Sequence, residues 1–264
     1  MMRSCLAVAL AAILLSATVA TTPASARGGD KPTVVLVHGA FGDASGYGAV
    51  TDRLQDRGYT VISPPNPLRG PASDAAYVAS VMRTISGPIV LVAHSYGGAV
   101  ASVAATQVTN VKALVYLDAL ALEAGESSLD ILERFPSKLF PALQTRPFPQ
   151  ADGSEGTDLY IDPAKFRSVF AADLPAGTTT RMATAQRPVA LAAAEEKSTE
   201  PAWKTIPSWY LVGRQDQIFT ADAQRFMAKR ARARVTQINS SHASYISRPA
   251  EVTKVILSAA QSVG

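Results

Sequence analysis

A buried strand that runs directly into a serine and two glycines is the feature that most constrains this chain. Residues 89–93 are five apolar residues with no polar alternation, which predicts a strand buried on both faces of a sheet. His-Ser-Tyr-Gly-Gly follows at 94–98, and the small residues at 99–105 predict a helix. A serine between a buried strand and a helix fits the sharp turn, or elbow, that exposes a nucleophilic hydroxyl.

The usual elbow pattern is Gly-x-Ser-x-Gly, and Ala93 stands at its first position as the smallest replacement for glycine. The alternative is an ordinary serine at the N-cap of a buried helix, which leaves the glycines after Ser95 unexplained. The start of the helix also favours negative charge beside the hydroxyl. We therefore interpret Ser95 as a nucleophile.

Strand and helix patterns alternate on both sides of the elbow. This alternation predicts an α/β fold with a mostly parallel sheet that helices cover on both faces. A chain of 264 residues is long enough for one such domain with an insertion. The predicted strands are 33–38, 59–63, 89–93, 111–117, 206–212 and 235–239, and the predicted helices are 47–57, 73–85, 99–105, 221–231 and 249–262.

Residues 119–205 interrupt this rhythm. They contain no convincing strand, four prolines between 136 and 149, and a flexible bend at 152–156. We predict a helical cap inserted between two parts of one core, 27–118 and 206–264. The helical patches are 128–135, 163–172 and 178–196.

The N-terminus has the features of a secretory signal peptide. Met-Met-Arg-Ser begins the chain, an apolar run follows at 5–15, and small residues at 24–26 predict cleavage after Ala26. The run is too short for a stable membrane anchor, so we expect a secreted or periplasmic protein. Cleavage would also remove Cys5, the only cysteine, and leave 238 residues that must fold without disulfides.

Composition excludes several other classes of function. The net charge of +4 is mild, and the basic residues between 225 and 234 lack interleaved aromatics, so we expect no nucleic-acid partner. No His or Cys cluster has metal-ligand spacing and no glycine-rich loop fits a phosphate, so we expect no metal and no cofactor. The oligomeric state stays open.

Ser95 needs a base, and the chain has three histidines. His38 ends a strand and is best explained as structural, and His94 points away from its neighbour at a sharp turn. His242 lies in a polar loop between the last strand and the last helix, where it can reach the elbow. The acid that orients it has two candidates, Asp216 and Asp118, which both follow predicted strands at the carboxyl edge of the sheet.

Four motifs together resemble the α/β-hydrolase superfamily, and within it the serine esterases that include methylsalicylate esterases and hydroxynitrile lyases. They are Val-His-Gly-Ala at 37–40, the elbow at 92–98, Gly-Arg-Gln-Asp at 213–216 and Ser-His at 241–242. The resemblance implies an α/β-hydrolase fold with a small cap.

That resemblance also implies roles for individual residues. The family order of serine, acid and histidine favours Asp216, with Asp118 as the alternative acid. The backbone amides of Ala40 and Tyr96 would form an oxyanion hole, and Phe41 would line the pocket. Aromatic residues of the cap, Trp203 among them, indicate an apolar pocket.

Together with the predicted signal peptide, these roles imply a secreted serine hydrolase that cleaves small to medium carboxylic esters through an acyl-enzyme. One alternative is a non-catalytic or slow ligand-binding protein on the same scaffold; another is a cofactor-free perhydrolase. Hydroxynitrile lyases of the group carry lysine after the catalytic histidine and threonine in the first loop. This chain has Ala243 and Gly39 there, which argues against a lyase.

Overall fold

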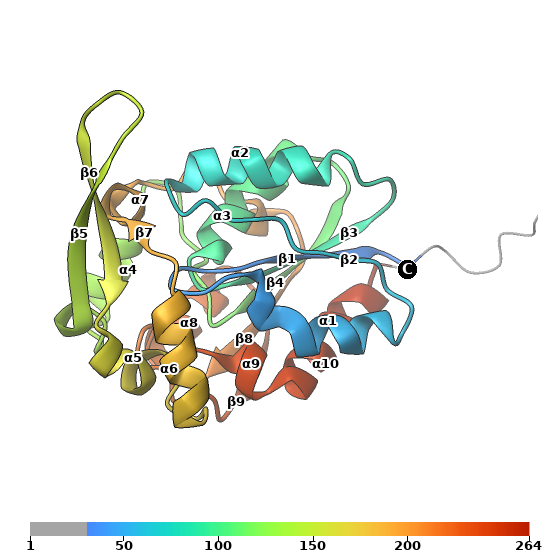
Figure 1. Ribbon diagram of the computed structural model, residues 1–264. Coiled ribbons are helices and arrows are strands. Elements are labelled where there is room, and N and C mark those ends of the chain that lie inside the picture. Colours follow the sequence, from blue (N-terminus) through green and yellow to red (C-terminus); the bar gives the residue numbers. More distant parts are fainter. Residues whose placement is uncertain (1–30, 264) are drawn as a thin grey trace, which may run out of the picture.

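The computed structural model describes residues 31–263, and a six-stranded parallel sheet forms the centre of this part of the chain (Figure 1). The strand order is β2-β1-β3-β4-β8-β9. The predicted α/β architecture is thereby confirmed, while the predicted signal peptide lies outside the described residues. The strands are β1 (Thr33–Val37), β2 (Val61–Ile62), β3 (Ile89–His94), β4 (Val111–Leu117), β8 (Ser208–Gly213) and β9 (Arg234–Ile238).

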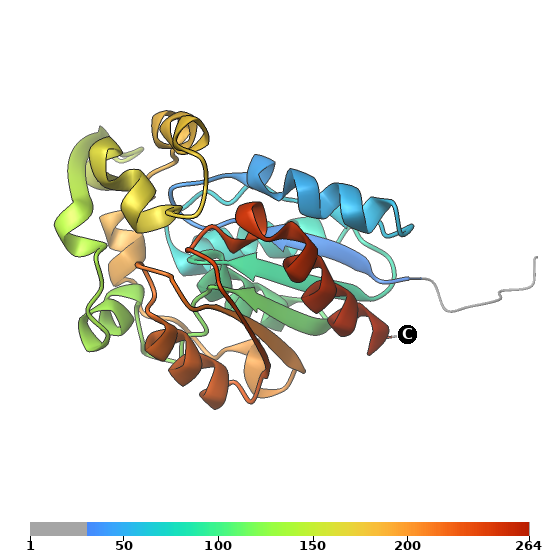
Figure 2. The ribbon, with the colours of Figure 1, turned by 90° about the horizontal axis from the view of Figure 1, so that it is seen from below.

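Both faces of the sheet are buried, which explains why its central strands are apolar without alternation. In β3, for example, Leu91 packs into one hydrophobic cluster and Val92 into the other. Figure 1 shows α2 and α3 above the sheet and α1 and α10 below it, and Figure 2 shows α1 and α10 side by side. The core helices are α1 (Gly48–Gln55), α2 (Pro71–Met82), α3 (Gly97–Ala104), α8 (Ala221–Arg230), α9 (Ser244–Ser247) and α10 (Pro249–Gln261).

The insertion at 119–205 contains strands as well as helices, so the expectation that it has no strand is wrong. Its helices are accompanied by a three-stranded antiparallel sheet in the order β5-β6-β7. The helices are α4 (Ser128–Arg134), α5 (Pro163–Phe170), α6 (Ala176–Ala185) and α7 (Leu191–Glu195), and the strands are β5 (Leu143–Pro149), β6 (Glu155–Ile161) and β7 (Val189–Ala190). Short 3₁₀ helices are Ala44–Tyr47 in the first loop, Ala105–Gln107 after α3, Phe140–Ala142 and Ala202–Lys204.

Two prolines explain why β5 does not look like a strand. Pro147 and Pro149 have no backbone N–H to donate, a pattern that argues against a central strand. β5 is an edge strand, hydrogen-bonded only to β6, with Pro147 opposite Thr157 and Pro149 opposite Glu155. The bend predicted at 152–156 belongs to the turn of this hairpin, which extends away from the sheet in Figure 1.

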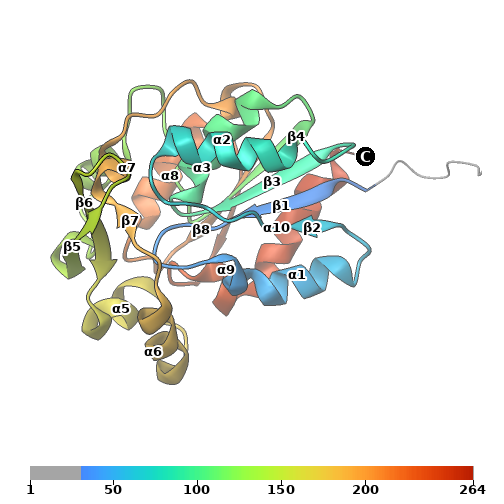
Figure 3. The same ribbon diagram turned by 45° about the horizontal axis from the view of Figure 1, so that its top comes forward.

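The insertion lies at the end of the central sheet where the parallel strands finish (Figures 1 and 3). Its contacts with the core include the amide of Phe41, which donates to the carbonyl of Arg187 at 2.8 Å. An ion pair also joins Arg69 of the core to Asp158 of β6 at 2.5 Å. The carboxyl edge of the sheet is therefore covered by the insertion. Within residues 31–263, no helix has the length and apolar character needed to cross a membrane.

Candidate active site

Ser95 occupies a strained turn between β3 and α3. Its φ of +55° lies in the left-handed region, which side chains other than glycine rarely adopt. Two glycines permit the turn, because neighbouring atoms lie too close to their Cα atoms to leave room for a side chain. A Cβ on Gly97 would lie 2.7 Å from the carbonyl oxygen of Val37, and one on Gly39 would lie 2.5 Å from the Cβ of Ser95. The elbow predicted from sequence is therefore present, with Ala93 accommodated in the buried strand.

The structure brings Ser95, His242 and Asp216 together in one chain of hydrogen bonds. Nε2 of His242 lies 2.8 Å from Oγ of Ser95, and Nδ1 of His242 lies 2.7 Å from Oδ2 of Asp216. Asp216 follows β8 and His242 follows β9, so the strand ends position all three. A neutral imidazole has one donor and one acceptor nitrogen. With Nδ1 donating to Asp216, Nε2 accepts the proton of the Ser95 hydroxyl.

Burial controls the electrostatics of this chain of bonds. It lowers the pKa of the His242 imidazole to about 3, which keeps the ring neutral. Burial also raises the pKa of Asp216, while the backbone amides of Ile218 and Phe219 lower it by donating to Oδ1 at 2.7 and 3.1 Å. A neutral base beside a hydroxyl is the arrangement that proton abstraction requires.

Gln224 of α8 is a further contact of Asp216 that the sequence analysis missed. Its amide nitrogen donates to Oδ2 of Asp216 at 2.9 Å, and its amide oxygen accepts from the backbone N–H of Gly213 at 3.1 Å. Gln224 is fully buried between Ala223 and Met227 on the inner face of the helix. A glutamine on the apolar face of a predicted helix is the signal that could have revealed it.

Asp118, the alternative acid, is not the carboxylate bonded to His242. It follows β4 with a φ of +47° and is fully buried beside Gly213. Burial raises its pKa well above the usual range, and the nearby charge of Asp216 raises it further. We therefore expect a neutral carboxyl group at Asp118.

The other two histidines support the backbone around the site. Nδ1 of His38 donates to the carbonyl of Gly39 at 2.9 Å, and Nε2 accepts from the amide of Asn66 at 3.1 Å. Nε2 of His94 donates to the carbonyl of His242 at 2.8 Å. Burial lowers the pKa of both rings, most strongly that of His94.

The amides of Ala40 and Tyr96 flank Ser95. Both residues line the same pocket as the serine, and within residues 31–263 neither amide donates to another group. The next amide along, that of Phe41, is already bonded to Arg187. Free backbone donors near a nucleophile can bind the negative oxygen that develops during attack on a carbonyl.

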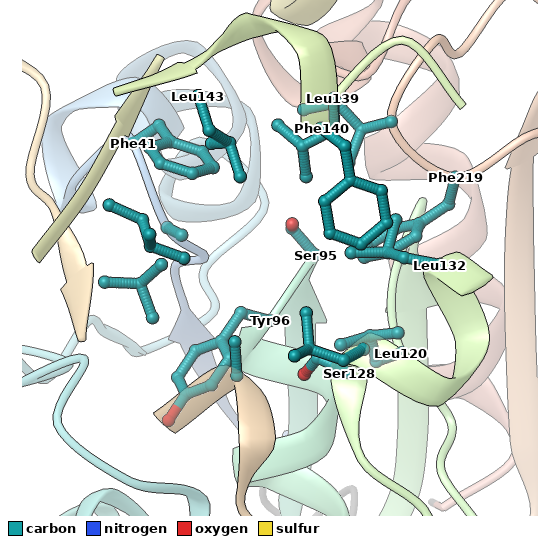
Figure 4. A pocket seen from close by; sticks show the side chains of 16 residues that line it. Phe41, Ser95, Tyr96, Leu120, Ser128, Leu132, Leu139, Phe140, Leu143 and Phe219 are labelled. Atoms are coloured by element: carbon teal, nitrogen blue, oxygen red, sulfur yellow. The ribbon is translucent and has the colours of Figure 1, made fainter. Parts of the chain in front are cut away.

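The pocket above Ser95 is almost entirely apolar (Figure 4). Its polar lining residues are Ser95, Tyr96 and Ser128, and no charged side chain lines it. Core and insertion both contribute to its wall, so the insertion shapes the space over the serine. The larger apolar lining residues include Phe41, Leu120, Leu132, Leu139, Phe140, Leu143 and Phe219.

Of the two aromatic residues predicted to line the pocket, Phe41 does so and Trp203 does not. Nε1 of Trp203 donates to the carbonyl of Leu122 at 3.0 Å, and the ring lines a separate cavity with Lys204 and Arg230. A count of aromatic residues gives no direction to their side chains, which is why this prediction is wrong. No group of three or more His, Cys, Asp or Glu side chains in the described part of the chain could hold a metal ion.

Comparisons with known proteins agree with this architecture. The alpha/beta hydrolase family model matches residues 34–255. The chain is 26% identical to the alpha/beta hydrolase nvfD of Aspergillus novofumigatus over 252 residues, 87% of this chain and 97% of that protein. It is also 26% identical to the pyrethroid hydrolase of Sphingobium wenxiniae over 246 residues, covering 84% and 85% of the two chains. The crystal structure of polyneuridine aldehyde esterase superposes with a TM-score of 0.75 at 18% identity, over 86% of this chain and 98% of that one. The protein belongs to the alpha/beta hydrolase family.

Proposed function

We propose that this protein is a serine esterase that hydrolyses small to medium, uncharged carboxylic esters through an acyl-enzyme on Ser95. The observation that carries the proposal is the unbroken path of hydrogen bonds from Ser95 through His242 to Asp216, at the floor of an apolar pocket. The names of two similar proteins, a pyrethroid hydrolase and polyneuridine aldehyde esterase, support an ester as the substrate.

In the first half-reaction, Oγ of Ser95 attacks the ester carbonyl while Nε2 of His242 takes the hydroxyl proton. Asp216 stabilises the imidazolium that forms. The amides of Ala40 and Tyr96 hold the oxyanion of the tetrahedral intermediate, a contribution of about 3 kcal/mol per donor in comparable sites. The carbon–oxygen bond to the alcohol then breaks, and His242 returns its proton to the departing alcohol.

In the second half-reaction, water replaces the alcohol. His242 takes a proton from the water as its oxygen attacks the acyl-enzyme carbonyl, and the same two amides hold the second oxyanion. The bond to Oγ breaks, the carboxylic acid leaves, and the proton on His242 returns to Ser95. Apart from the substrate and this water, the groups used in the cycle are Ser95, His242, Asp216 and the two backbone amides.

The lining of the pocket supports a neutral, apolar substrate. A charged acyl or alcohol group would lose its hydration there without gaining an ionic partner, because no charged side chain lines the cavity. Apolar groups would gain contacts with leucine and phenylalanine side chains.

The proposal is tested with p-nitrophenyl esters of increasing acyl length, together with labelling by a fluorophosphonate. We expect turnover that peaks at short and medium chains, and labelling that is lost in Ser95→Ala. Ser128→Ala is the matched control, because Ser128 lines the same pocket without bonding to His242. A protein that binds esters but turns none over would be a binding protein, and a peak at long chains would overturn the proposed substrate size.

We also propose that the protein is exported after cleavage behind Ala26. The sequence features at 1–26 support this proposal. Terminal sequencing of the mature protein should find Arg27 as its first residue. A mature protein that retains Met1 inside the cell would contradict export.

A further inference from the structure

The loop that carries His242 is held from outside the core by a carboxylate of the insertion. Asp173 follows α5, and both of its carboxylate oxygens accept hydrogen bonds from Ser241. The hydroxyl of Ser241 lies 2.5 Å from Oδ1, and the backbone N–H of Ser241 lies 3.2 Å from Oδ2. Ser241 is the residue immediately before His242, so this contact fixes the backbone at the start of the histidine.

The same loop is tied down at other points. The backbone N–H of Ala243 donates to the hydroxyl oxygen of Ser241 at 3.3 Å. The hydrogen-bond network that begins at Asp173 therefore includes the residues on both sides of His242. On the core side, the amide of Gln215 donates to the carbonyl of Ser240 at 3.0 Å. The loop is therefore held between the insertion and the segment that carries Asp216.

The insertion also contacts the imidazole itself. The ring of Phe170, at the end of α5, meets the ring of His242 edge-on, with centroids 5.2 Å apart and planes at 80°. Phe170 and Asp173 thus reach the ring and the backbone of the same residue from one short segment. Asp173 itself does not line the pocket over Ser95.

We propose that Asp173 is a positioning residue, which holds the His242 loop so that Nε2 stays within hydrogen-bond reach of Ser95. The inference rests on the proposed function of His242 as the base. It means that the geometry of the proton path depends on contacts between the insertion and the core. The insertion then has a role in the reaction as well as in shaping the pocket.

Loss of this carboxylate should slow the chemical step and leave substrate binding unchanged. A displacement of about 1 Å at a catalytic group can cost about 100-fold in rate. We expect Asp173→Ala to lower kcat by roughly 10- to 100-fold, with little change in KM because Asp173 does not contact the pocket. Asp173→Asn keeps one carbonyl acceptor and should retain more activity.

The design includes a second partner and a matched control. Ser241→Ala should lower kcat as well, and the double variant should lose less than the product of the two single losses, because both changes remove the hydrogen bond between the Ser241 hydroxyl and Asp173. Asp162 caps the other end of α5 by accepting from the amide of Ala164 at 3.0 Å. Asp162→Ala should lower the melting temperature and leave kcat near the wild-type value.

The rate of fluorophosphonate labelling of Ser95 separates this inference from the proposed function, since it reports the base without an ester substrate. If the wild type is labelled but turns over no ester, the proposed function fails, and the labelling rates of the variants still test Asp173. A folded Asp173→Ala that is labelled and turned over at the wild-type rate would overturn the role of Asp173 alone. An equal loss of kcat in Asp162→Ala would also overturn the role of Asp173, since the effect would then come from the stability of α5.

Discussion

The hydroxyl of Tyr96 donates a hydrogen bond to Oδ2 of Asp74 across 2.8 Å, which ties the residue after the nucleophile to helix α2. Asp74 is fully buried, and the backbone N–H groups of Arg69 and Gly70 donate to the same oxygen at 3.1 and 3.4 Å. Because the amide of Tyr96 is a proposed oxyanion donor, its side chain anchors a group that needs a fixed position.

Tyr96→Phe should therefore affect both stability and rate. It leaves a buried carboxylate with one donor fewer, which should cost about 1–3 kcal/mol of unfolding free energy. A less firmly held oxyanion donor should lower kcat about 3- to 10-fold. Denaturant unfolding and ester kinetics measure the two effects. Tyr116→Phe is the control, because its hydroxyl is bonded to Ser102, at 2.8 Å, instead of to Asp74; an equal loss of kcat there would contradict the anchoring role.

Mutation of the two candidate acids, Asp216 and Asp118, should have very different effects on kcat. Asp216→Asn replaces the acceptor of the His242 Nδ1 proton and should lower kcat about 1,000- to 10,000-fold, because the imidazole loses its orientation and charge partner. Asp118→Asn should leave kcat within about 3-fold of the wild-type value, because a neutral carboxyl group and an amide have similar size. Steady-state kinetics with one p-nitrophenyl ester decide the matter. The assignment is reversed if Asp118→Asn is the more damaging change.

The free energy of unfolding should reveal the raised pKa of Asp118. In the unfolded chain this carboxyl ionises near pH 4, whereas burial raises its pKa well above that value in the folded protein. Stability from this group is thus fully present below pH 4 and is lost as the pH rises toward the folded-state pKa. Asp118→Asn removes that loss, so the variant should gain stability relative to wild type between pH 4 and 8. Parallel stability curves over that range would contradict a buried neutral Asp118.

The pH dependence of ester cleavage should follow the lowered pKa of His242. Burial takes it to about 3, so the imidazole stays able to accept the Ser95 proton in mildly acidic solution. We expect kcat/KM to persist below pH 6.5, the ordinary value for histidine. Because the pKa of His242 is lower in the folded state, this imidazole binds a proton more readily in the unfolded chain once the pH falls below 6.5. The free energy of unfolding therefore decreases in acid. Unfolding is therefore measured at each pH. A kcat/KM that already falls with an apparent pKa near 7, in protein that is still fully folded, would contradict the prediction.

The core was predictable because its signals are local. Each buried strand is an apolar run, and the run at 89–93 leads straight into Ser95 and its glycines. The position of a residue at a strand end also placed Asp216 and His242 near the same edge of the sheet. The hydrogen bonds that link Ser95 to His242 and His242 to Asp216 follow from that common edge.

The insertion was less predictable because its structure depends on partners distant in sequence. Pro147 reads as a strand breaker, yet it is tolerated on an edge strand that pairs with β6 alone. Trp203 is an aromatic residue of the insertion whose direction only packing decides. Asp173 looks like any loop carboxylate until the fold brings it to Ser241, 68 residues later in the chain.

The long separation between Ser95 and His242, 147 residues, has a consequence for the newly made protein. The nucleophile is synthesised well before its base, and the whole insertion comes between them. An unfinished chain on the ribosome therefore has a serine without a proton acceptor. Under the proposed mechanism, reactivity requires the C-terminal segment that follows β9, so a premature stop there would leave most of the sheet without ester cleavage.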